Sequence, residues 1–126
     1  MPVRSLNSSV LKWPDRSTVD RAVHDWARAP VARHPGVIKI GYFGSYARGN
    51  WGVGSDLDLI AIVSRCSEPF ERRPLDWDLS DLPVPAELLV YTSEEWELLV
   101  QQGRRFARTV EREAVWVYKA VTLTDE

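Results

Sequence analysis

Residues 40–63 read IGYFGSYARGNWGVGSDLDLIAIV and join two apolar runs through a glycine-rich connection. The first run covers residues 37–43 and stops at Gly44-Ser45, and the second covers residues 56–63 and opens with Asp56-Leu57-Asp58. Short apolar runs that are rich in Ile and Val and bounded by glycine are typical of buried strands. The stretch therefore predicts a strand, a tight turn and a second strand, with polar residues gathered at the turn.

The two aspartates of the second strand form the first candidate site. Asp56 and Asp58 stand two residues apart, so their side chains point to one face while Leu57 points into the core. Two neighbouring carboxylates repel each other unless a cation lies between them, and Mg²⁺ is typically held by one or two carboxylates plus substrate phosphates. Two such ions roughly 4 Å apart can clamp an in-line displacement. The pattern favours a magnesium site, although a lone Asp-x-Asp at a strand start is often only solvated.

The turn before these aspartates supplies a candidate phosphate site. Gly44 lets the backbone approach a ligand closely, and a helix that begins near Ser45 would present free N–H groups to an anion. Arg48 lies one turn further on and could reach a phosphate. No Gly-Lys-Ser/Thr follows, and the later glycines lack the dinucleotide-binding spacing, so neither of those phosphate loops is indicated. Trp51 could stack on a nucleobase or cap the core.

Capping and periodicity predict the remaining elements. Ser17 and Asp20 resemble a capping box that begins a helix ended or bounded by Pro30 and Pro35-Gly36, and Thr92 with Glu95 resembles a second capping box. Gly103 is a plausible helix stop. The predicted segments are an irregular lead-in over residues 1–16, a proline-rich loop over 64–85, strands over 86–92 and 114–123, and a helix over 104–113. This order predicts an α/β (α+β) domain built on one small mixed β-sheet with flanking helices.

These motifs resemble the signature of the DNA polymerase β-like nucleotidyltransferase superfamily, and within it the minimal nucleotidyltransferase (MNT) family. The pattern Gly-Ser-x10-Asp-x-Asp fits at every specified position, and the similarity continues through LPVPAELLVYTSEEW and GRRFARTVEREAVWVY. The resemblance implies a nucleotidyltransferase fold and the transfer of a nucleoside monophosphate from an NTP, with ATP as the expected donor and two Mg²⁺ ions. By position, the resemblance implies that Gly44 and Ser45 hold the β- and γ-phosphates. Arg48 and Ser55 complete the predicted nucleotide-binding residues.

The same resemblance implies Asp56 and Asp58 as metal ligands and a third carboxylate on the following strand. That family usually has Asp there, and Glu87 stands at the matching position of this chain. Neighbouring strands can bring Glu87 beside the two aspartates, where it could bind metal or act as a general base. A solvated strand-end glutamate is the alternative reading. The rival carboxylates of the proline-rich loop are Asp76, Asp78 and Asp81.

The predicted site contains groups for the nucleotide and the metal but none for the acceptor of the transferred group. No second domain for it is predicted, so we expect the acceptor on another macromolecule. In the resembled family, minimal proteins pair with helical HEPN-domain proteins as toxin–antitoxin pairs, and the antitoxin adenylylates a tyrosine of its partner. One alternative is an enzyme that modifies a small molecule, such as an antibiotic hydroxyl, across a homodimer cleft. The other is a non-catalytic module that neutralises a partner by contact.

Composition narrows the possible partners. The 126 residues are 44% hydrophobic, which suits one folded domain over residues 1–126. A net charge of −2 offers no overall field for nucleic acid. The basic helix face is expected to be solvated and paired with Glu111 and Glu113. Its members are Arg104, Arg105, Arg108 and Arg112.

Two absences in the sequence narrow the class of protein further. Cys66 is the only cysteine, which excludes an intrachain disulfide and a cysteine-based zinc site. No long apolar run or N-terminal apolar segment is present, so we expect a cytoplasmic protein without a membrane span.

Overall fold

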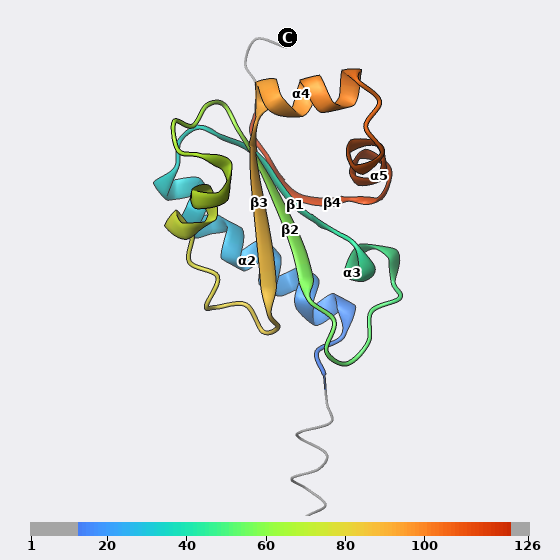
Figure 1. Cartoon of the computed structure of the whole chain (residues 1–126). Helices are drawn as coiled ribbons and strands as arrows, with labels where there is room; N and C mark the ends of the chain where they lie inside the picture. The colour runs from blue at the N-terminus through green and yellow to red at the C-terminus, as the bar shows by residue number, and fades with distance from the viewer. Residues whose placement is uncertain (1–12, 122–126) are drawn as a thin grey trace, which may run out of the picture.

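A four-stranded mixed sheet with strand order β3-β2-β1-β4 forms the centre of the computed structural model, which describes residues 13–121 (Figure 1). β1 (Val37–Phe43) pairs antiparallel with β2 (Leu57–Val63) on one side and with β4 (Val115–Lys119) on the other. β3 (Ala86–Thr92) runs parallel to β2. The predicted mixed sheet is confirmed, and β1 and β3 have the bounds that the sequence predicts.

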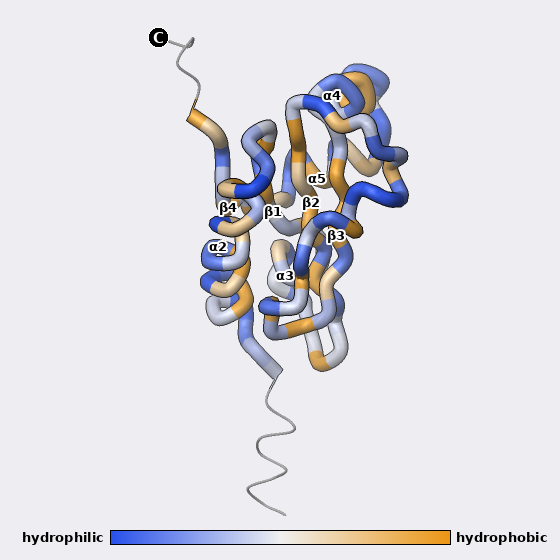
Figure 2. The backbone as a smooth tube through the Cα atoms, turned by 90° about the vertical axis from the view of Figure 1, so that its left-hand side faces the viewer, coloured by the Kyte–Doolittle hydropathy of each residue, from blue (hydrophilic) through white to orange (hydrophobic). Residues whose placement is uncertain are grey.

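Helices cover both faces of the sheet (Figures 1 and 2). α2 (Arg16–Arg33) lies on one face, and α4 (Ser93–Gln101) and α5 (Arg105–Glu113) lie on the other. α3 (Ser45–Arg48) is a single turn that follows β1, and a 3-10 helix, η1 (Phe70–Asp76), packs beside β3. Among the described residues, no helix combines the length and the apolar character needed to cross a membrane.

Strand alternation divides the core between the two faces. On β2, Leu57 and Leu59 are fully buried in the cluster that includes α2, whereas Ile60 and Ile62 join a cluster on the opposite face with Trp96 of α4. Successive side chains of a strand point to opposite faces, so an apolar run without alternation is what a strand covered on both sides requires. Figure 2 shows the corresponding hydrophobic segments along the strands between the helical layers.

The start of α2 differs from the prediction. Asp15, not Ser17, is the N-cap, and its carboxylate accepts a hydrogen bond from the Thr18 N–H at 2.9 Å. Asp20 makes no capping box, because its carboxylate instead accepts the hydroxyl hydrogen of Tyr42 from β1 at 2.8 Å. A contact with a distant strand thus replaced the local contact that the spacing suggested.

Of the two predicted stops of α2, Pro30 lies inside the helix, and Pro35-Gly36 follows directly after its end. The helix continues to Arg33, and the His34 N–H closes it by donating to the Pro30 carbonyl at 2.8 Å. Proline in a helix interior removes one hydrogen bond. Pro30 is buried against the core, and this burial offsets the loss.

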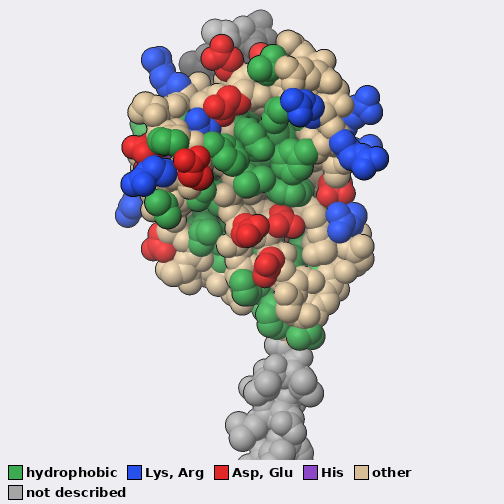
Figure 3. Space-filling model, in the orientation of Figure 1, with side chains coloured by type: hydrophobic (Ala, Val, Ile, Leu, Met, Phe, Trp, Pro, Cys, Tyr) green, Lys and Arg blue, Asp and Glu red, His purple; other side chains and the backbone are tan. Residues whose placement is uncertain are grey.

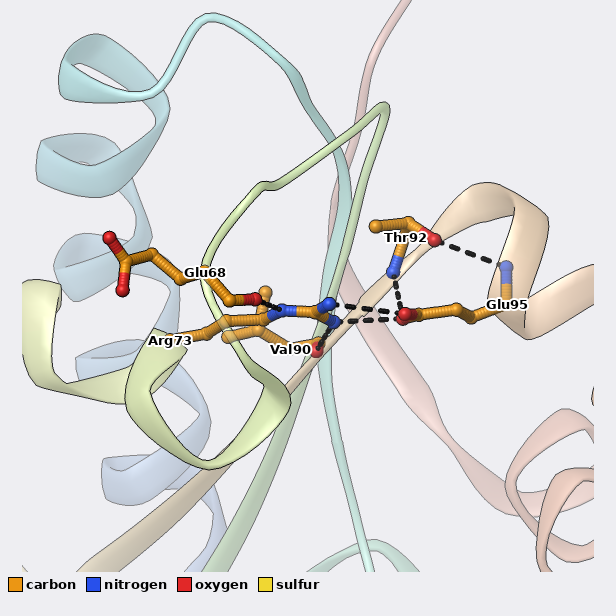
Figure 4. Close-up of polar contacts among 5 residues, drawn as sticks. All are labelled: Glu68, Arg73, Val90, Thr92 and Glu95. Atoms are coloured by element: carbon orange, nitrogen blue, oxygen red, sulfur yellow. Dashed lines mark hydrogen bonds and ion pairs between the residues drawn. The ribbon is translucent and has the colours of Figure 1, made fainter.

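The segment 64–85 is more ordered than a loop prediction implies. It contains η1, and it buries the Arg73 guanidinium, which donates two hydrogen bonds to the Glu95 carboxylate at 2.8 and 3.1 Å (Figure 4). Arg73 also donates to the carbonyls of Glu68 and Val90. Glu95 completes the confirmed capping box with Thr92. One arginine therefore links the segment to β3 and to the start of α4.

The remaining boundaries shift by a residue or more. β2 begins at Leu57 instead of Asp56, α5 begins at Arg105, and β4 spans Val115–Lys119. The predicted end of the last strand at Leu123, and residues 1–12 of the predicted lead-in, lie outside the described residues.

The predicted pairing of the basic helix face is wrong. Glu111 accepts a hydrogen bond from the Trp96 indole at 2.7 Å, and Glu113 turns toward β1, so neither forms the expected ion pair within the helix. The exposed arginines of α5 therefore face solvent without those partners.

Candidate active site

Strand register brings the candidate carboxylates together. Asp58 of β2 lies opposite Phe43 of antiparallel β1 and opposite Glu87 of parallel β3. Directly opposed residues of neighbouring strands share a face, so Asp58 and Glu87 stand side by side. Asp56 precedes β2 by one residue and lines the same cavity as Asp58. The sequence-based expectation that these carboxylates share one side of the sheet agrees with this geometry.

The cavity beside these residues has a volume of about 510 Å³ and is open to solvent. This volume lies within the usual range for small-ligand sites. It is lined by Gly44, Ser45, Arg48, Ser55, Asp56 and Asp58, together with Phe43, Phe106, Thr109 and Glu113. Six of the seven predicted site residues thus line one cavity. Glu87 is exposed beside Asp58 but is not among the lining residues.

Gly44 holds the two halves of the site in close contact. Its φ of +80° lies in the left-handed region, and a Cβ at this position would collide with Asp58 Oδ2. Glycine is the residue that tolerates both the dihedral angle and the approach. The turn that would grip a phosphate therefore packs directly against the proposed metal ligand.

α3 presents donors to the same cavity. Its first internal hydrogen bond runs from the Arg48 N–H to the Gly44 carbonyl at 3.0 Å. The N–H groups of residues 45–47 precede that bond, and the first N–H groups of any helix lack intrahelical partners. Ser45 lines the cavity, so its hydroxyl and these N–H groups are suited to binding an anion.

Two contacts stabilise the connection from α3 to β2. Ser55 accepts a hydrogen bond from the Gly52 N–H at 2.8 Å, which closes the turn just before Asp56. Trp51 stacks on Tyr46, with ring centroids 5.6 Å apart and an interplanar angle of 8°. The half-buried Trp51 therefore caps the core in this structure.

Electrostatics at Asp58 favour a bound cation. Burial, and then the neighbouring charges of Glu87 and Asp56, raise the pKa of the Asp58 carboxyl above its ordinary value. Crowded carboxylates of this kind are relieved by a divalent cation. Within residues 13–121, no three His, Cys, Asp or Glu side chains converge tightly enough to hold a metal by themselves. Asp56 and Asp58 nevertheless fit Mg²⁺, which needs only one or two carboxylates when phosphate oxygens complete its shell.

Sequence reasoning missed four lining residues, of which Glu113 is the most consequential. Its Oε2 accepts hydrogen bonds from the Gly44 N–H at 3.0 Å and from Arg48 Nη1 at 3.3 Å. Glu113 is 69 residues from Gly44 in the sequence, so no local spacing connects the two. Phe43, Phe106 and Thr109 form the rest of this wall.

An apolar surface adjoins the carboxylates. Because Asp58 and Glu87 pair in register, the residues that follow on the same face are Ile60 beside Leu89 and Ile62 beside Tyr91. Ile60 and Ile62 are buried, whereas Leu89 and Tyr91 are partly exposed. Tyr91 packs against Phe70, Trp96 and Phe106. Figure 3 shows hydrophobic side chains gathered at the middle of this face, with acidic side chains directly below them and basic side chains along the right-hand edge.

Comparison with known families agrees with this arrangement. The family model of the nucleotidyltransferase domain matches residues 27–117 of the chain. That match includes β1, β2, β3, α3, the first three residues of β4 and every candidate site residue. The chain therefore belongs to the nucleotidyltransferase domain family, which confirms at this level the resemblance seen in the sequence.

Solved structures show the same fold in other proteins. A protein from Sulfolobus solfataricus described as a "putative nucleotidyltransferase" superposes with a TM-score of 0.60 at 16% identity, over 82% of this chain and 83% of that one. A toxin–antitoxin complex with AMP-PNP aligns with a TM-score of 0.46 at 14% identity, over 81% of this chain and 76% of that one. The second similarity is too low to carry an argument. No protein of curated function matches the chain.

Proposed function

We propose that this protein transfers a nucleoside monophosphate, with ATP as the preferred donor, to a hydroxyl group of an acceptor. The observation that carries the proposal is the contact between Gly44 and Asp58, because it joins a phosphate-binding turn to a carboxylate pair in one cavity. Gly44, Ser45 and Arg48 would hold the β- and γ-phosphates, and Ser55 would support the turn. The α-phosphate would then lie next to Asp56 and Asp58.

The reaction is an in-line displacement. The acceptor oxygen forms a bond to the α-phosphorus, the bond between that phosphorus and the bridging oxygen to the β-phosphate breaks, and pyrophosphate leaves. Mg²⁺ held by Asp56 and Asp58 would neutralise the charge of the reacting phosphate oxygens. Glu87, next to Asp58 in the register, would take the hydroxyl proton as a general base or extend the metal ligand set.

The acceptor is proposed to be a protein, namely a helical HEPN-domain partner in a toxin–antitoxin pair. Two observations support a protein acceptor. The chain belongs to the nucleotidyltransferase domain family, and its sequence resembles the minimal members of the superfamily. An apolar surface also lies beside the carboxylates. That surface follows Asp58 and Glu87 on the same face of the sheet, so an acceptor that lies against it would have its hydroxyl close to Asp58. The exposed Phe70 and the partly exposed Tyr91 suit contact with a protein better than contact with a strongly polar antibiotic.

A transfer assay tests the proposal. The purified protein is incubated with α-labelled ATP, Mg²⁺ and the helical protein of the neighbouring gene, and both label transfer and pyrophosphate release are followed. We expect Asp56→Asn and Asp58→Asn each to lower the rate by about 100-fold or more, the range seen when one transition-state contact is removed. Asp25→Asn is the matched control, because Asp25 is an exposed carboxylate of α2 far from the cavity.

The outcomes separate the alternatives. Label on an aminoglycoside but not on the protein partner would favour small-molecule modification. Full neutralisation of the partner by the double variant Asp56→Asn, Asp58→Asn would favour a non-catalytic binding module. Wild-type rates in Asp58→Asn would exclude the proposed role of the carboxylate pair.

A further inference from the structure

Glu113 occupies the phosphate-binding side of the cavity. It is the last residue of α5, only 16% of its side chain is exposed, and it lines the cavity with Ser45 and Asp58. One carboxylate oxygen, Oε2, accepts from both the Gly44 N–H and Arg48 Nη1. The Glu113 carboxylate, an anion of the protein itself, therefore occupies two hydrogen-bond donors next to the start of α3.

These two donors are among those that the proposed function assigns to the triphosphate. Carboxylate and phosphate oxygens bind the same backbone N–H and guanidinium groups. A backbone N–H has one hydrogen, so Gly44 cannot donate fully to Glu113 and to a phosphate at the same time. The Glu113 carboxylate must leave Gly44 for the triphosphate to enter.

Electrostatic repulsion also requires the Glu113 carboxylate to move away when a triphosphate binds. Glu113 is one of the groups whose negative charge acts on Asp58, so it lies within electrostatic range of the carboxylate pair. A triphosphate at α3 would add several further negative charges at hydrogen-bond distance from Glu113. Like charges this close repel strongly in a partly buried site.

We propose that Glu113 is a built-in competitor of the nucleotide: it holds Gly44 and Arg48 in the nucleotide-free protein and is displaced by the triphosphate. This inference rests on the proposed function of the cavity. Glu113 touches the binding groups and not the reacting atoms, so it is a positioning residue that sets nucleotide affinity. It keeps the turn in its binding geometry while it lowers the affinity for ATP.

A purely structural tie between α5 and β1 makes the opposite prediction. If Glu113 only braced the turn, weakening its hydrogen bonds would loosen Gly44 and Arg48, and ATP would bind less tightly. Competition predicts tighter binding. The sign of the change in Kd therefore distinguishes the two roles.

The test measures Kd for ATP and for inorganic triphosphate, with and without Mg²⁺, in wild type, Glu113→Gln and Glu113→Ala. Glutamine keeps an oxygen for Gly44 but loses the charge, so it preserves the fold while weakening the competing contact. We expect Kd to fall by roughly 3- to 10-fold in Glu113→Gln, the difference between a charged and a neutral hydrogen bond. Adenosine, which has no phosphate, is expected to bind equally to both proteins.

Two controls sharpen the result. Glu97→Gln removes the same charge from an exposed position of α4 and is expected to leave Kd unchanged. In an Arg48→Ala background the gain from Glu113→Gln is expected to shrink, because the two residues share one contact and their effects should not add. The KM for ATP is expected to fall with Kd while kcat stays within a few-fold.

The results separate this inference from the proposed function. If wild type binds ATP and Glu113→Gln binds it no more tightly, Glu113 does not compete with the nucleotide, and the proposed function is unaffected. If neither wild type nor any variant binds ATP or triphosphate, the proposed function and the inference both fail.

Discussion

At the scale of single residues, the site depends on how closely Gly44 approaches Asp58. The phosphate turn and the carboxylate pair come from different strands, and the absence of a side chain at Gly44 is what lets them meet. A change of one methyl group should therefore disturb both halves.

Gly44→Ala is expected to lower the transfer rate by about 100-fold or more, since displacements near 1 Å have such effects on catalysis. It should also cost about 1–3 kcal/mol of stability, because alanine is strained at positive φ. Steady-state kinetics and urea denaturation measure the two effects. Gly52→Ala, in the same connection but with open space around its Cβ and no positive φ, is the control. Similar losses in both variants would contradict the role given to Gly44.

Asp58 illustrates a conflict between function and stability. Its pKa is raised in the folded protein, so the folded state binds protons more tightly than the unfolded state. This contribution to stability falls as the pH rises from the ordinary aspartate value through the raised one, and the penalty is complete above the raised value. In metal-free protein, Asp58→Asn is therefore expected to raise the free energy of unfolding at pH 7.

Urea denaturation of wild type and Asp58→Asn between pH 4 and 7 measures that difference. The gain should shrink toward pH 4, and Mg²⁺ with ATP should stabilise wild type more than the variant. A variant that is less stable than wild type at pH 7 would show that Asp58 is held by favourable contacts instead of being crowded by like charges.

At the scale of elements, Arg73 connects three parts of the fold. It links η1 to the carbonyl of Val90 in β3 and to Glu95 in the first turn of α4 (Figure 4). The Arg73 side chain is 7% exposed, whereas the Glu95 side chain is 45% exposed. Removing Glu95 would leave a buried charge with only carbonyl partners.

Glu95→Ala is expected to destabilise the protein by roughly 2–3 kcal/mol, from the unpaired arginine and the lost capping box. Glu94→Ala, an exposed neighbour in the same helical turn, should have little effect. The Arg73 hydrogen bonds lower the pKa of Glu95, so its contribution is present above the ordinary glutamate value and lost as the pH falls through the lowered one. Denaturation at pH 7 should thus separate the two variants, and a low-pH series should bring them together.

At the scale of the whole molecule, the sheet places an apolar surface next to the proposed catalytic carboxylates (Figure 3). Phe70 of η1 is 38% exposed and packs on Tyr91. Large exposed apolar patches in soluble proteins commonly mark interaction sites. The proposed protein acceptor would dock there.

Phe70→Ser is expected to raise the KM for the protein acceptor by roughly 10-fold, equivalent to about 1.4 kcal/mol of binding, without changing the Kd for ATP. Leu75→Ser removes a more exposed apolar side chain from the same 3-10 helix and serves as the control. Label transfer at varied partner concentration measures the effect. Equal KM values for Phe70→Ser and wild type would place the acceptor elsewhere.

Local sequence signals predicted the elements that depend on local physics. The capping box of Thr92 and Glu95 located α4, because hydrogen bonds between near neighbours form it. The apolar runs located β1 and β3, because a strand covered on both faces needs apolar side chains along its length. The spacing of Gly44, Asp56 and Asp58 predicted the cavity, since a strand, a turn and a strand bring fixed positions together. Family membership followed from the same motif.

Sequence patterns did not predict the contacts between residues that are far apart in the chain. Asp20 accepts a hydrogen bond from Tyr42 instead of forming a helix cap. Pro30 lies within a helix and is buried in the core. Glu113 accepts a hydrogen bond from Gly44, which is 69 residues away in the sequence. Each outcome depends on which groups the packed sheet and helices place side by side. The sequence by itself determined the strands, the turn and the chemical groups of the site. Only the tertiary structure decided which of those groups compete for the same hydrogen bonds, because that choice depends on distances that no spacing encodes.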